Sequence, residues 1–430
     1  MKKMHVSFNG KNNRFSDHTD KSKAYSGASI DRPLALILGL ALLPVFIFNT
    51  LFALIRLDNT FRLQYKMDAL GRPVTLRAFT FGWFKHSAIL FDIILGNLGF
   101  CGVSCSHKVS KKKQHLFINK AKIKTGIFSL YDLHLKTGLT VTSEDDLFEQ
   151  QLNGSFINYL TLLMKSMLCT FLYGSKSNNL KNTKELSLFG LKIKNTSMKE
   201  AVDWITQNSN DNIHTKLGFF INVNSINLSI NNYFFSNQLK QADALFVDGS
   251  GMRLAAAKAG YRLNGNNNGT DMLPHLCRSA IKNNQSLYLF GAQPTIAAKA
   301  AKNLKGQFPG LMIAGVQHGY SNLSDDELIA DINKSNCDVL LVAMGSPIQE
   351  QWLIDNKDKL QCKTALAVGG LFDFYSGAIS RSPMWLRELG MEWVWRLMQE
   401  PLKKFNRYVI GTPLFLYRTF FLNLANTGEK

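Results

Sequence analysis

The stretch Leu217–Ala259 constrains the fold of this 430-residue chain more than any other part of it. It contains two short apolar runs, Leu217–Val223 and Ala244–Val247, each long enough for a buried strand and too short for a helix. A helical stretch separates the runs, and an Asp-Gly-Ser-Gly turn at residues 248–251 leads into another helix. This alternation predicts the α/β class, with a Rossmann-like parallel sheet covered by helices.

Polar residues stand at the end of both apolar runs. Asn222 and Asn224 stand at the end of the first run, and Asp248 directly follows the second. In parallel α/β sheets, ligands bind beyond the carboxyl ends of the strands, so the three side chains are candidates for a ligand site. The residues alone allow Asp248 a second role, because Asp is also a frequent N-cap of a following helix.

The same alternation continues downstream, and its motifs occur in a recognisable order. They are Ser286–Gly291, Val316–Tyr320, Asp338–Trp352, Thr364–Asp373, Arg381–Trp385 and Gly390–Pro401. In this order, from about Leu186 to Phe420, they resemble the WecG/TagA/CpsF glycosyltransferase family. The resemblance implies an inverting, metal-independent transferase at the cytoplasmic membrane face. Such enzymes move a sugar from a nucleotide sugar, often UDP-ManNAc or UDP-ManNAcA, onto a polyprenyl-diphosphate-linked sugar.

The resemblance also implies roles for individual residues. Asp248 matches the family's proposed catalytic base, the group that takes the proton of the acceptor hydroxyl. Asn222 stands where a Thr is common, and Ile348 replaces a Lys beside Gln349. Leu402 and Asn406 stand where Arg is frequent. The substrate-binding residues expected in this way are Asn222, Asn224, Arg262, Asp271, Gln349, Arg396, Lys403, Lys404 and Arg407.

We expect no cofactor and no metal ion. Gly249, Gly251 and Ala255 are similar to a dinucleotide fingerprint, but Asp271 at the required spacing follows an Asn-rich segment that is no strand. No Asp-x-Asp stands at a strand end as a metal ligand. The acids Asp325 and Asp326 are better explained as first-turn residues of a helix. His318, before Gly319, is more typical of a structural turn than of catalysis.

The net charge of +19 favours an anionic partner. No nucleic-acid-binding signature accompanies the charge, so no nucleic acid is expected. A long apolar segment near the N-terminus indicates membrane lipid and phosphate groups instead. The six cysteines are scattered through apolar runs, which is typical of buried thiols in a reducing compartment.

Residues 1–30 are polar and basic and predict a disordered tail. The apolar segment Pro33–Ile55 follows, with Pro44 in its middle. It is long enough for a bilayer core, and the proline predicts a break. Two interpretations are open, a kinked transmembrane helix and a re-entrant hairpin. Lys and Arg on both sides favour the hairpin, with both ends cytoplasmic.

Residues 31–173 resemble bacterial sugar transferases that load phospho-sugars onto polyprenyl phosphate. The broken apolar segment, Gly71–Phe79, Asp92–Asn97 and Thr125–Ile127 carry this resemblance. Lys85 and His86 stand where that family has its Asp-Glu dyad, so the phosphate-attacking carboxylate is missing. We therefore expect a catalytically silent membrane-anchoring domain. An unrelated anchor with chance similarity is the alternative.

The remaining segments complete the expected domain organisation. Lysines between residues 108 and 124 predict either a solvated loop or a surface for anionic lipid. The apolar helix Phe156–Tyr173 precedes a polar linker at residues 174–185. The transferase core occupies residues 186–380, and a basic, aromatic appendage occupies residues 381–430. The aromatic residues of this appendage favour a membrane-interface surface over a core-packing terminal helix.

Together these patterns predict a membrane-associated glycosyltransferase of cell-surface polysaccharide biosynthesis, on the cytoplasmic face and monotopic or single-pass. Its expected partners are a UDP-sugar donor and a polyprenyl-diphosphate-linked acceptor. Two alternatives are a bifunctional enzyme with an active N-terminal phosphoglycosyltransferase and a non-catalytic scaffold that binds nucleotide sugar. The sequence leaves open whether the protein forms a homo-oligomer.

Overall fold

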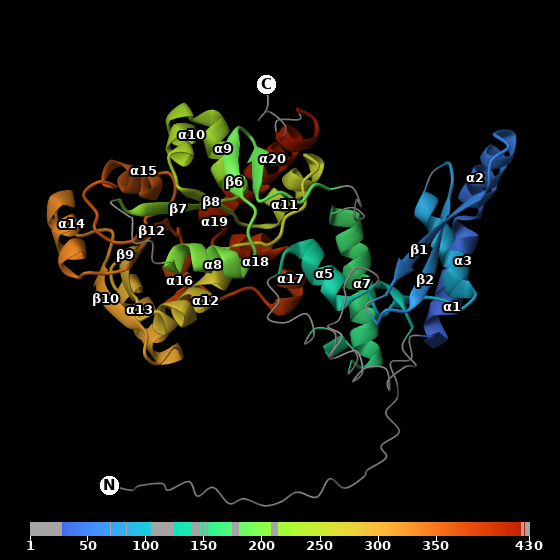
Figure 1. Ribbon diagram of the computed structural model, residues 1–430, viewed down its shortest axis with the longest axis horizontal. Helices are drawn as coiled ribbons and strands as arrows, with labels where there is room; N and C mark the ends of the chain where they lie inside the picture. The colour runs from blue at the N-terminus through green and yellow to red at the C-terminus, as the bar shows by residue number, and fades with distance from the viewer. Residues whose placement is uncertain are drawn as a thin grey trace, which may run out of the picture. The chain divides into compact units, whose positions relative to one another are not determined.

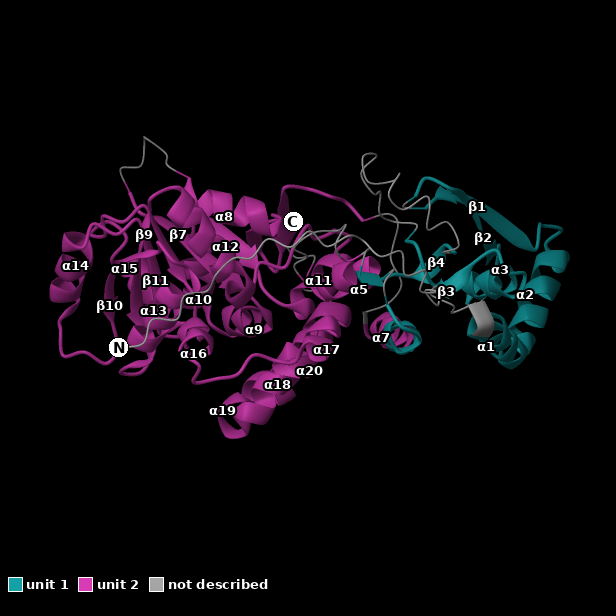
Figure 2. Cartoon of the chain, turned by 90° about the horizontal axis from the view of Figure 1, so that it is seen from below, with its two compact units in different colours: residues 1–129, 148–162 teal, residues 130–147, 163–430 magenta. Residues whose placement is uncertain are grey.

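A computed structural model gives the fold in two compact units. It describes residues 28–68, 70–82, 84–104, 124–139, 147, 150–151, 154–173, 180–207, 214–422 and 425. Unit 1 comprises Met1–Ser129 and Phe148–Leu162, and unit 2 comprises Leu130–Leu147 and Leu163–Lys430 (Figure 2). The predicted tail before residue 28, the lysines at positions 108–122 and residues 174–179 of the linker lie outside the described residues.

Unit 1 combines an apolar helix pair with two small sheets. Its helices are α1 (Ala28–Ala41), α2 (Leu43–Ile55), the 3-10 helix η1 (Lys85–Ala88), α3 (Ile89–Ile94) and the first part of α7 (Phe156–Tyr173). β1 (Phe61–Met67) pairs antiparallel with β2 (Pro73–Phe79), and β3 (Gly99–Cys101) pairs parallel with β4 (Gly126–Phe128). The Phe46 ring of α2 packs 5.5 Å from Phe79 and 5.2 Å from Phe91, so an aromatic cluster joins α2 to β2 and α3.

The predicted break in the apolar segment is confirmed. Pro44 lies in the first turn of α2, where its missing N–H leaves no bond unmade. Among the described residues no single helix is long and apolar enough to cross a membrane. The helices Ile30–Ala41 and Leu43–Ile55, bent by 66°, meet the length and composition criteria only as a pair. Large apolar side chains of this pair are exposed, among them Ile37, Leu40, Leu51 and Ile55.

Unit 2 is built on a mostly parallel eight-stranded sheet (Figure 1). The strand order is β10-β9-β11-β12-β7-β8-β6-β5, and only the edge pair β5/β6 is antiparallel. The strands are β5 (Glu185–Leu188), β6 (Leu191–Lys194), β7 (Lys216–Ile221), β8 (Ala244–Val247), β9 (Ser286–Gly291), β10 (Met312–Gln317), β11 (Val339–Ala343) and β12 (Thr364–Ala367). The predicted α/β class with a parallel sheet is thus confirmed.

Helices bury both faces of this sheet. Successive residues of β11 alternate between two hydrophobic clusters, with Leu340 and Val342 in one and Leu341 and Ala343 in the other. The first cluster includes side chains of α9 (Val223–Asn231), α10 (Tyr233–Lys240), α11 (Ser250–Lys258), α14 (Asp325–Lys334) and α15 (Ile348–Asp355). The second includes side chains of α8 (Met198–Thr206), α12 (Gly269–Lys282), α13 (Ile296–Gln307) and α16 (Leu371–Tyr375). The carboxyl ends of the strands therefore stay open between two helical layers.

Local sequence signals explain several helix starts. Ser197 and Glu200 form the predicted capping box at the start of α8. Asp325 and Asp326 stand in the first turn of α14, as expected.

Leu180 and the residues after it are described, and Lys181 forms a parallel bridge with Tyr261. The five described cysteines are free and buried, in agreement with the predicted thiols.

The C-terminal helices lie over the carboxyl ends of the parallel strands. They are α17 (Met384–Glu388), α18 (Glu392–Gln399), α19 (Pro401–Phe405), the π-helix η2 (Asn406–Ile410) and α20 (Gly411–Phe420). α20 packs on α9 and α11 and buries Phe415 fully. Trp385, Phe405, Tyr417 and Phe421 are exposed instead. The aromatic residues of this segment are thus divided between core packing and an exposed surface.

Candidate active site

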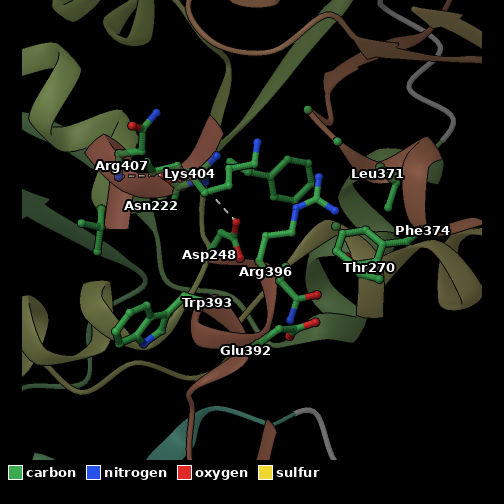
Figure 3. A pocket seen from close by; sticks show the side chains of 18 of the residues that line it. Asn222, Asp248, Thr270, Leu371, Phe374, Glu392, Trp393, Arg396, Lys404 and Arg407 are labelled. Carbon is green, nitrogen blue, oxygen red and sulfur yellow. Dashed lines mark hydrogen bonds between the residues drawn. The ribbon is translucent and has the colours of Figure 1, made fainter. Parts of the chain in front are cut away.

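A cavity of about 1190 Å³ opens in unit 2 at the carboxyl ends of the parallel strands (Figure 3). Residues that directly follow β7, β8, β11 and β12 line it, namely 222–224, 248–251, 344–346 and 368–371. Side chains of α18, α19, η2 and α20 line it from the other side. This is the edge where an open α/β sheet binds its ligands.

Asp248 lies within this cavity, one residue beyond β8. Its backbone N–H continues the ladder to Ile221 O at 2.9 Å, and Gly249 then turns the chain with φ of +94°, a region that favours glycine. Gly249 is the N-cap residue of α11, so the alternative role of Asp248 as that cap is excluded. The carboxylate is therefore free of a capping role and is directed into the cavity (Figure 3).

The environment of Asp248 shifts its proton affinity. Burial raises the pKa of Asp248 above its usual value of 3.8. The hydrogen bond from Asn222 and the positive charge of Arg407 oppose this shift, and the negative charge of Asp271 adds to it. A carboxylate with a raised pKa is a stronger base, so the site suits Asp248 to proton abstraction.

Asn222 connects the first helix of the site to Asp248. Its Oδ1 accepts hydrogen bonds from the backbone N–H groups of Asn224 and Ser225 at 3.0 and 3.1 Å, and so caps α9. Its Nδ2 donates to Asp248 Oδ2 at 3.4 Å. The strand predicted to reach Val223 therefore ends at Ile221, because Asn222 starts the helix. Asn224 also lines the cavity.

Gln349 is buried and holds two loops together. Its Oε1 accepts from the backbone N–H of Gly345 at 3.2 Å and of Gly369 at 2.9 Å. Its Nε2 donates to Glu350 Oε1 at 3.0 Å. These bonds join the turn after β11 to the turn after β12. Gln349 lines the cavity, but most of its hydrogen-bonding capacity is used within the protein.

Cationic side chains of α18, α19 and η2 gather on one side of the cavity. Arg396 stacks over the Phe374 ring at 5.0 Å and pairs with Asp373 Oδ2 at 3.4 Å and Glu400 Oε2 at 3.0 Å. Lys403 and Lys404 share the same Glu400. Burial lowers the pKa of Lys404, and the positive charges of Arg396 and Arg407 lower it further. Arg396, Lys404 and Arg407 thus lie close together in the cavity (Figure 3), and Asp373 and Glu400 offset part of their charge.

Asp271 and Arg262, also expected in the site, differ in their surroundings. Asp271 lines the cavity, and its Oδ1 accepts from Arg381 and, at 3.0 Å, from Arg387 Nη2. It thereby connects α12 to α17 and to the segment before it. Arg262 is exposed and does not line the cavity; its carbonyl accepts from Asn195 Nδ2 at 2.9 Å. We therefore leave Arg262 out of the site.

Two neighbouring cavity residues were not expected in the site: Glu392 carried no predicted role, and Trp393 was expected only in the membrane-interface surface. Glu392 and Trp393 start α18 and line the cavity beside Asp248 (Figure 3). Burial raises the pKa of Glu392, and the negative charges of Asp271 and Asp248 contribute to the shift. The sequence signal that could have pointed to Glu392 is that it is an acid within the basic segment after residue 380.

His318 Nδ1 accepts from the backbone N–H of Tyr320 at 3.2 Å, which confirms the predicted turn role.

The described residues contain no group of three or more His, Cys, Asp or Glu side chains that could hold a metal ion. The cationic side chains that line the cavity are Arg387, Arg396, Lys403, Lys404 and Arg407.

Comparison with known proteins identifies the family. The model of the family described as Glycosyl transferase WecG/TagA/CpsF matches residues 186–428, more than half of the chain. Similar proteins include the N-acetylglucosaminyldiphosphoundecaprenol N-acetyl-beta-D-mannosaminyltransferases of Staphylococcus aureus strains MRSA252, MW2 and NCTC 8325 / PS 47. Each is 26% identical over 238 residues, which are 55% of this chain and 92% of the relative. This chain belongs to the WecG/TagA/CpsF family and is a glycosyltransferase.

Proposed function

We propose that the protein transfers an N-acetylmannosamine-type sugar, or another hexose, from a UDP-sugar onto a polyprenyl-diphosphate-linked amino sugar, with inversion. The relatives are named for transfer of N-acetyl-beta-D-mannosamine to N-acetylglucosaminyldiphosphoundecaprenol. The observation that carries the proposal is the position of Asp248, a carboxylate with a raised pKa inside a cavity that five cationic side chains also line.

The proposed reaction is a single displacement. The acceptor hydroxyl oxygen attacks the anomeric carbon of the donor and forms the new glycosidic bond. Asp248 takes the proton of this hydroxyl, and the bond between the anomeric carbon and the diphosphate breaks, releasing UDP. One carboxylate is sufficient for this step, whereas a double displacement requires a second carboxylate as nucleophile.

Cationic side chains support departure of the diphosphate. As the bond to the anomeric carbon breaks, negative charge grows on the leaving oxygen. Arg396, Lys404 and Arg407 lie in the same cavity as Asp248 and are fixed by packing against Phe374, Glu400 and Tyr408. Preorganised cations at such a position stabilise the transition state because little reorganisation is needed as charge develops. Gln349 then acts as a positioning residue between two loops.

The first test is a donor screen with full-length protein in detergent. The acceptor is N-acetylglucosaminyl-diphosphoundecaprenol, and UDP- and GDP-sugars are offered in the presence of EDTA. We expect one UDP-sugar to be consumed with release of UDP, and Asp248→Asn to lose activity by at least about a hundredfold. Asp326→Asn, an exposed Asp that pairs with Lys359, is the matched control. Binding of UDP without turnover of any donor would favour a non-catalytic scaffold.

We also propose that unit 1 is a monotopic membrane anchor derived from a phosphoglycosyltransferase that lost its catalytic dyad. Its bent apolar helix pair exposes large hydrophobic side chains, which supports membrane association. Lys85 and His86 lie in η1, directly before α3, where a dyad would be expected. Asp92 of α3 is buried and pairs with Arg77 at 3.2 Å, so it holds β2 against α3. Release of UMP from a UDP-sugar and polyprenyl phosphate would contradict this proposal and indicate a bifunctional enzyme.

A further inference from the structure

Part of the cavity wall comes from outside the residues that match the family. Thr137, Gly138 and Leu139, at the end of α5 (Leu130–Thr137), and Leu172 of α7 line the cavity. The family match begins only at residue 186. All four residues belong to unit 2 together with the cavity. We call Thr137–Leu139 and Leu172 the helical wall.

We propose that the helical wall binds the first isoprene units of the lipid-linked acceptor, so that the helices before the family domain form part of the acceptor site. This inference rests on the proposed function, because it requires a polyprenyl-diphosphate-linked acceptor. It assigns a substrate-binding role to residues of the chain that the family match does not include.

A part-buried ion-pair cluster fixes the helical wall in place. The carboxylate of Glu388, in α17, accepts from Lys165 of α7 and lies 3.5 Å from Nε2 of His134 in α5. The backbone carbonyl of Glu388 accepts from the Cys169 thiol at 3.7 Å. α5 and α7 are joined by a further bond, from Lys136 Nζ to Thr170 Oγ1 at 2.7 Å. The wall is therefore a fixed part of unit 2, and α5 lies beside α17 in Figures 1 and 2.

Gly138 brings the wall against the residues that support Asp248. It has φ of +77°, and a Cβ at this position would lie 2.9 Å from Arg253 Nη2 and 3.1 Å from Asn266 Cβ. Asn266 Oδ1 in turn accepts from the backbone N–H of Gly249 at 2.7 Å. The wall therefore contacts Asn266, Asn266 binds Gly249, and Gly249 directly follows the proposed base Asp248.

The strand order indicates which substrate the wall meets. Asp248 follows β8, whereas β12 and β11 lie two and three strands away on one side of it. At about 4.8 Å per strand, the turn after β11 is roughly 14 Å from the end of β8. Arg396, which we assign to the donor diphosphate, packs on Phe374 just beyond β12. The helical wall contacts α11, which follows β8. It therefore lies near Asp248 and away from the β12 side of the cavity, to which we assign the donor diphosphate, so we place the acceptor beside the wall.

The chemistry of the wall suits a hydrocarbon chain. Leu139 and Leu172 are apolar, and the Thr137 hydroxyl donates to Leu133 O at 3.1 Å, so it is already engaged. The neighbouring helices α11 and α20 add Leu254 and Leu416 to the cavity lining. A nucleotide or a sugar requires convergent polar groups, which these side chains do not supply.

The test compares Leu139→Asn and Leu172→Asn with wild-type full-length protein in detergent. Phe171→Asn is the matched control, because Phe171 is 87% exposed on the same helix and does not line the cavity. Two acceptors carry the same amino sugar diphosphate, one with an undecyl chain and one with a methyl group. We expect each cavity variant to raise KM for the undecyl acceptor about tenfold, because an apolar contact with the undecyl chain is lost. KM for the methyl acceptor and for the UDP-sugar should stay unchanged.

Other outcomes overturn the inference. An equal rise in KM for both acceptors would place the sugar or the diphosphate, and not the lipid, at the wall. A change in the donor KM alone would place the wall on the donor side. An equal effect of Phe171→Asn would assign the result to micelle binding by the helix surface. If wild-type protein uses neither acceptor, the proposed function itself fails. Melting curves identify a variant that does not fold, and the two leucines provide independent variants.

Discussion

The side-chain amide of Asn222 donates a hydrogen bond to Asp248 Oδ2 at 3.4 Å, while the carbonyl oxygen of the same side chain caps α9. One residue thus stabilises a helix start and contacts the proposed base. The two residues follow adjacent parallel strands, β7 and β8, so the sheet brings them together although they are 26 positions apart.

We expect Asn222→Ala to move the acid limb of the kcat/KM profile to higher pH. The hydrogen bond from Asn222 lowers the pKa of Asp248, so its loss raises that pKa further. Because the base acts only when deprotonated, activity then appears at a higher pH. Loss of the cap should also cost about 1 kcal/mol of stability. Asn232→Ala is the control, because Asn232 caps α10 through Phe235 N at 3.1 Å and does not line the cavity. It should lose stability without the pH shift, and an unmoved profile for Asn222→Ala would contradict the prediction.

Gly138→Ala should lower kcat more than the matched substitution Gly190→Ala. Both glycines have positive φ, +77° and +74°, so both variants carry a similar backbone strain of about 1 kcal/mol. A Cβ at Gly138 meets Arg253 and Asn266 within about 3 Å, whereas a Cβ at Gly190 meets nothing within 4 Å. Displacement of Asn266 should then disturb Gly249, beside Asp248. Melting temperature and kcat are measured for both variants, and equal kcat losses would argue against this coupling.

Arg396→Gln should reduce kcat about a hundredfold, in the range found for loss of one charge-stabilising group. The variant keeps a polar side chain but removes the charge that we assign to the leaving diphosphate. Arg278→Gln is the control, since Arg278 also stacks on an aromatic ring, Phe308 at 5.5 Å, but does not line the cavity. Steady-state kinetics with the UDP-sugar provide the measurement. An Arg396→Gln enzyme with wild-type kcat would exclude the assignment.

Glu388→Gln should lower the stability of unit 2 at neutral pH, and this loss of stability should disappear in acid. Burial alone would raise the pKa of Glu388, but the hydrogen bonds from His134 and Lys165 outweigh burial and hold the pKa below its usual value of 4.5. A depressed carboxyl pKa stabilises the fold above the unfolded-state pKa, and this stabilisation is lost as pH falls through the folded-state pKa. We expect a loss of about 1 to 3 kcal/mol at pH 7. The melting temperatures of wild type and variant should converge as pH falls below 4.5 and through the lower folded-state pKa of Glu388.

Local patterns were sufficient for many of the elements. The strand Ala244–Val247 and the helix Phe156–Tyr173 have the predicted bounds. The strand from Leu217 was predicted to end two residues too late. Asn222 and Val223 continue the apolar run in the sequence, but they form the N-cap and the first residue of α9. A residue's capping role depends on the direction of its side chain, and this direction is not visible in an apolar run.

The candidate site was partly visible in the same patterns. Asn222, Asn224 and Asp248 were expected together because the carboxyl ends of parallel strands meet at one edge of a sheet. Arg262 was placed in the site by a motif, yet it is exposed on a loop outside the cavity. Gln349 lines the cavity, but its side chain serves the two loops that it joins. A motif shows that a residue type is present, whereas its available hydrogen-bonding groups depend on its neighbours.

The amino-acid sequence alone was enough to establish the alternating strands and helices, the break at Pro44 and the polar residue after β8, because each depends on residues close together in the chain. It was not enough to show that Thr137–Leu139 and Leu172 line the cavity, or that Glu392 lies beside Asp248. The contact between His134 and Glu388 joins residues 254 positions apart. Contacts at such separations form only when packing of the apolar helix faces brings the segments together, so the chain must fold before they can be identified.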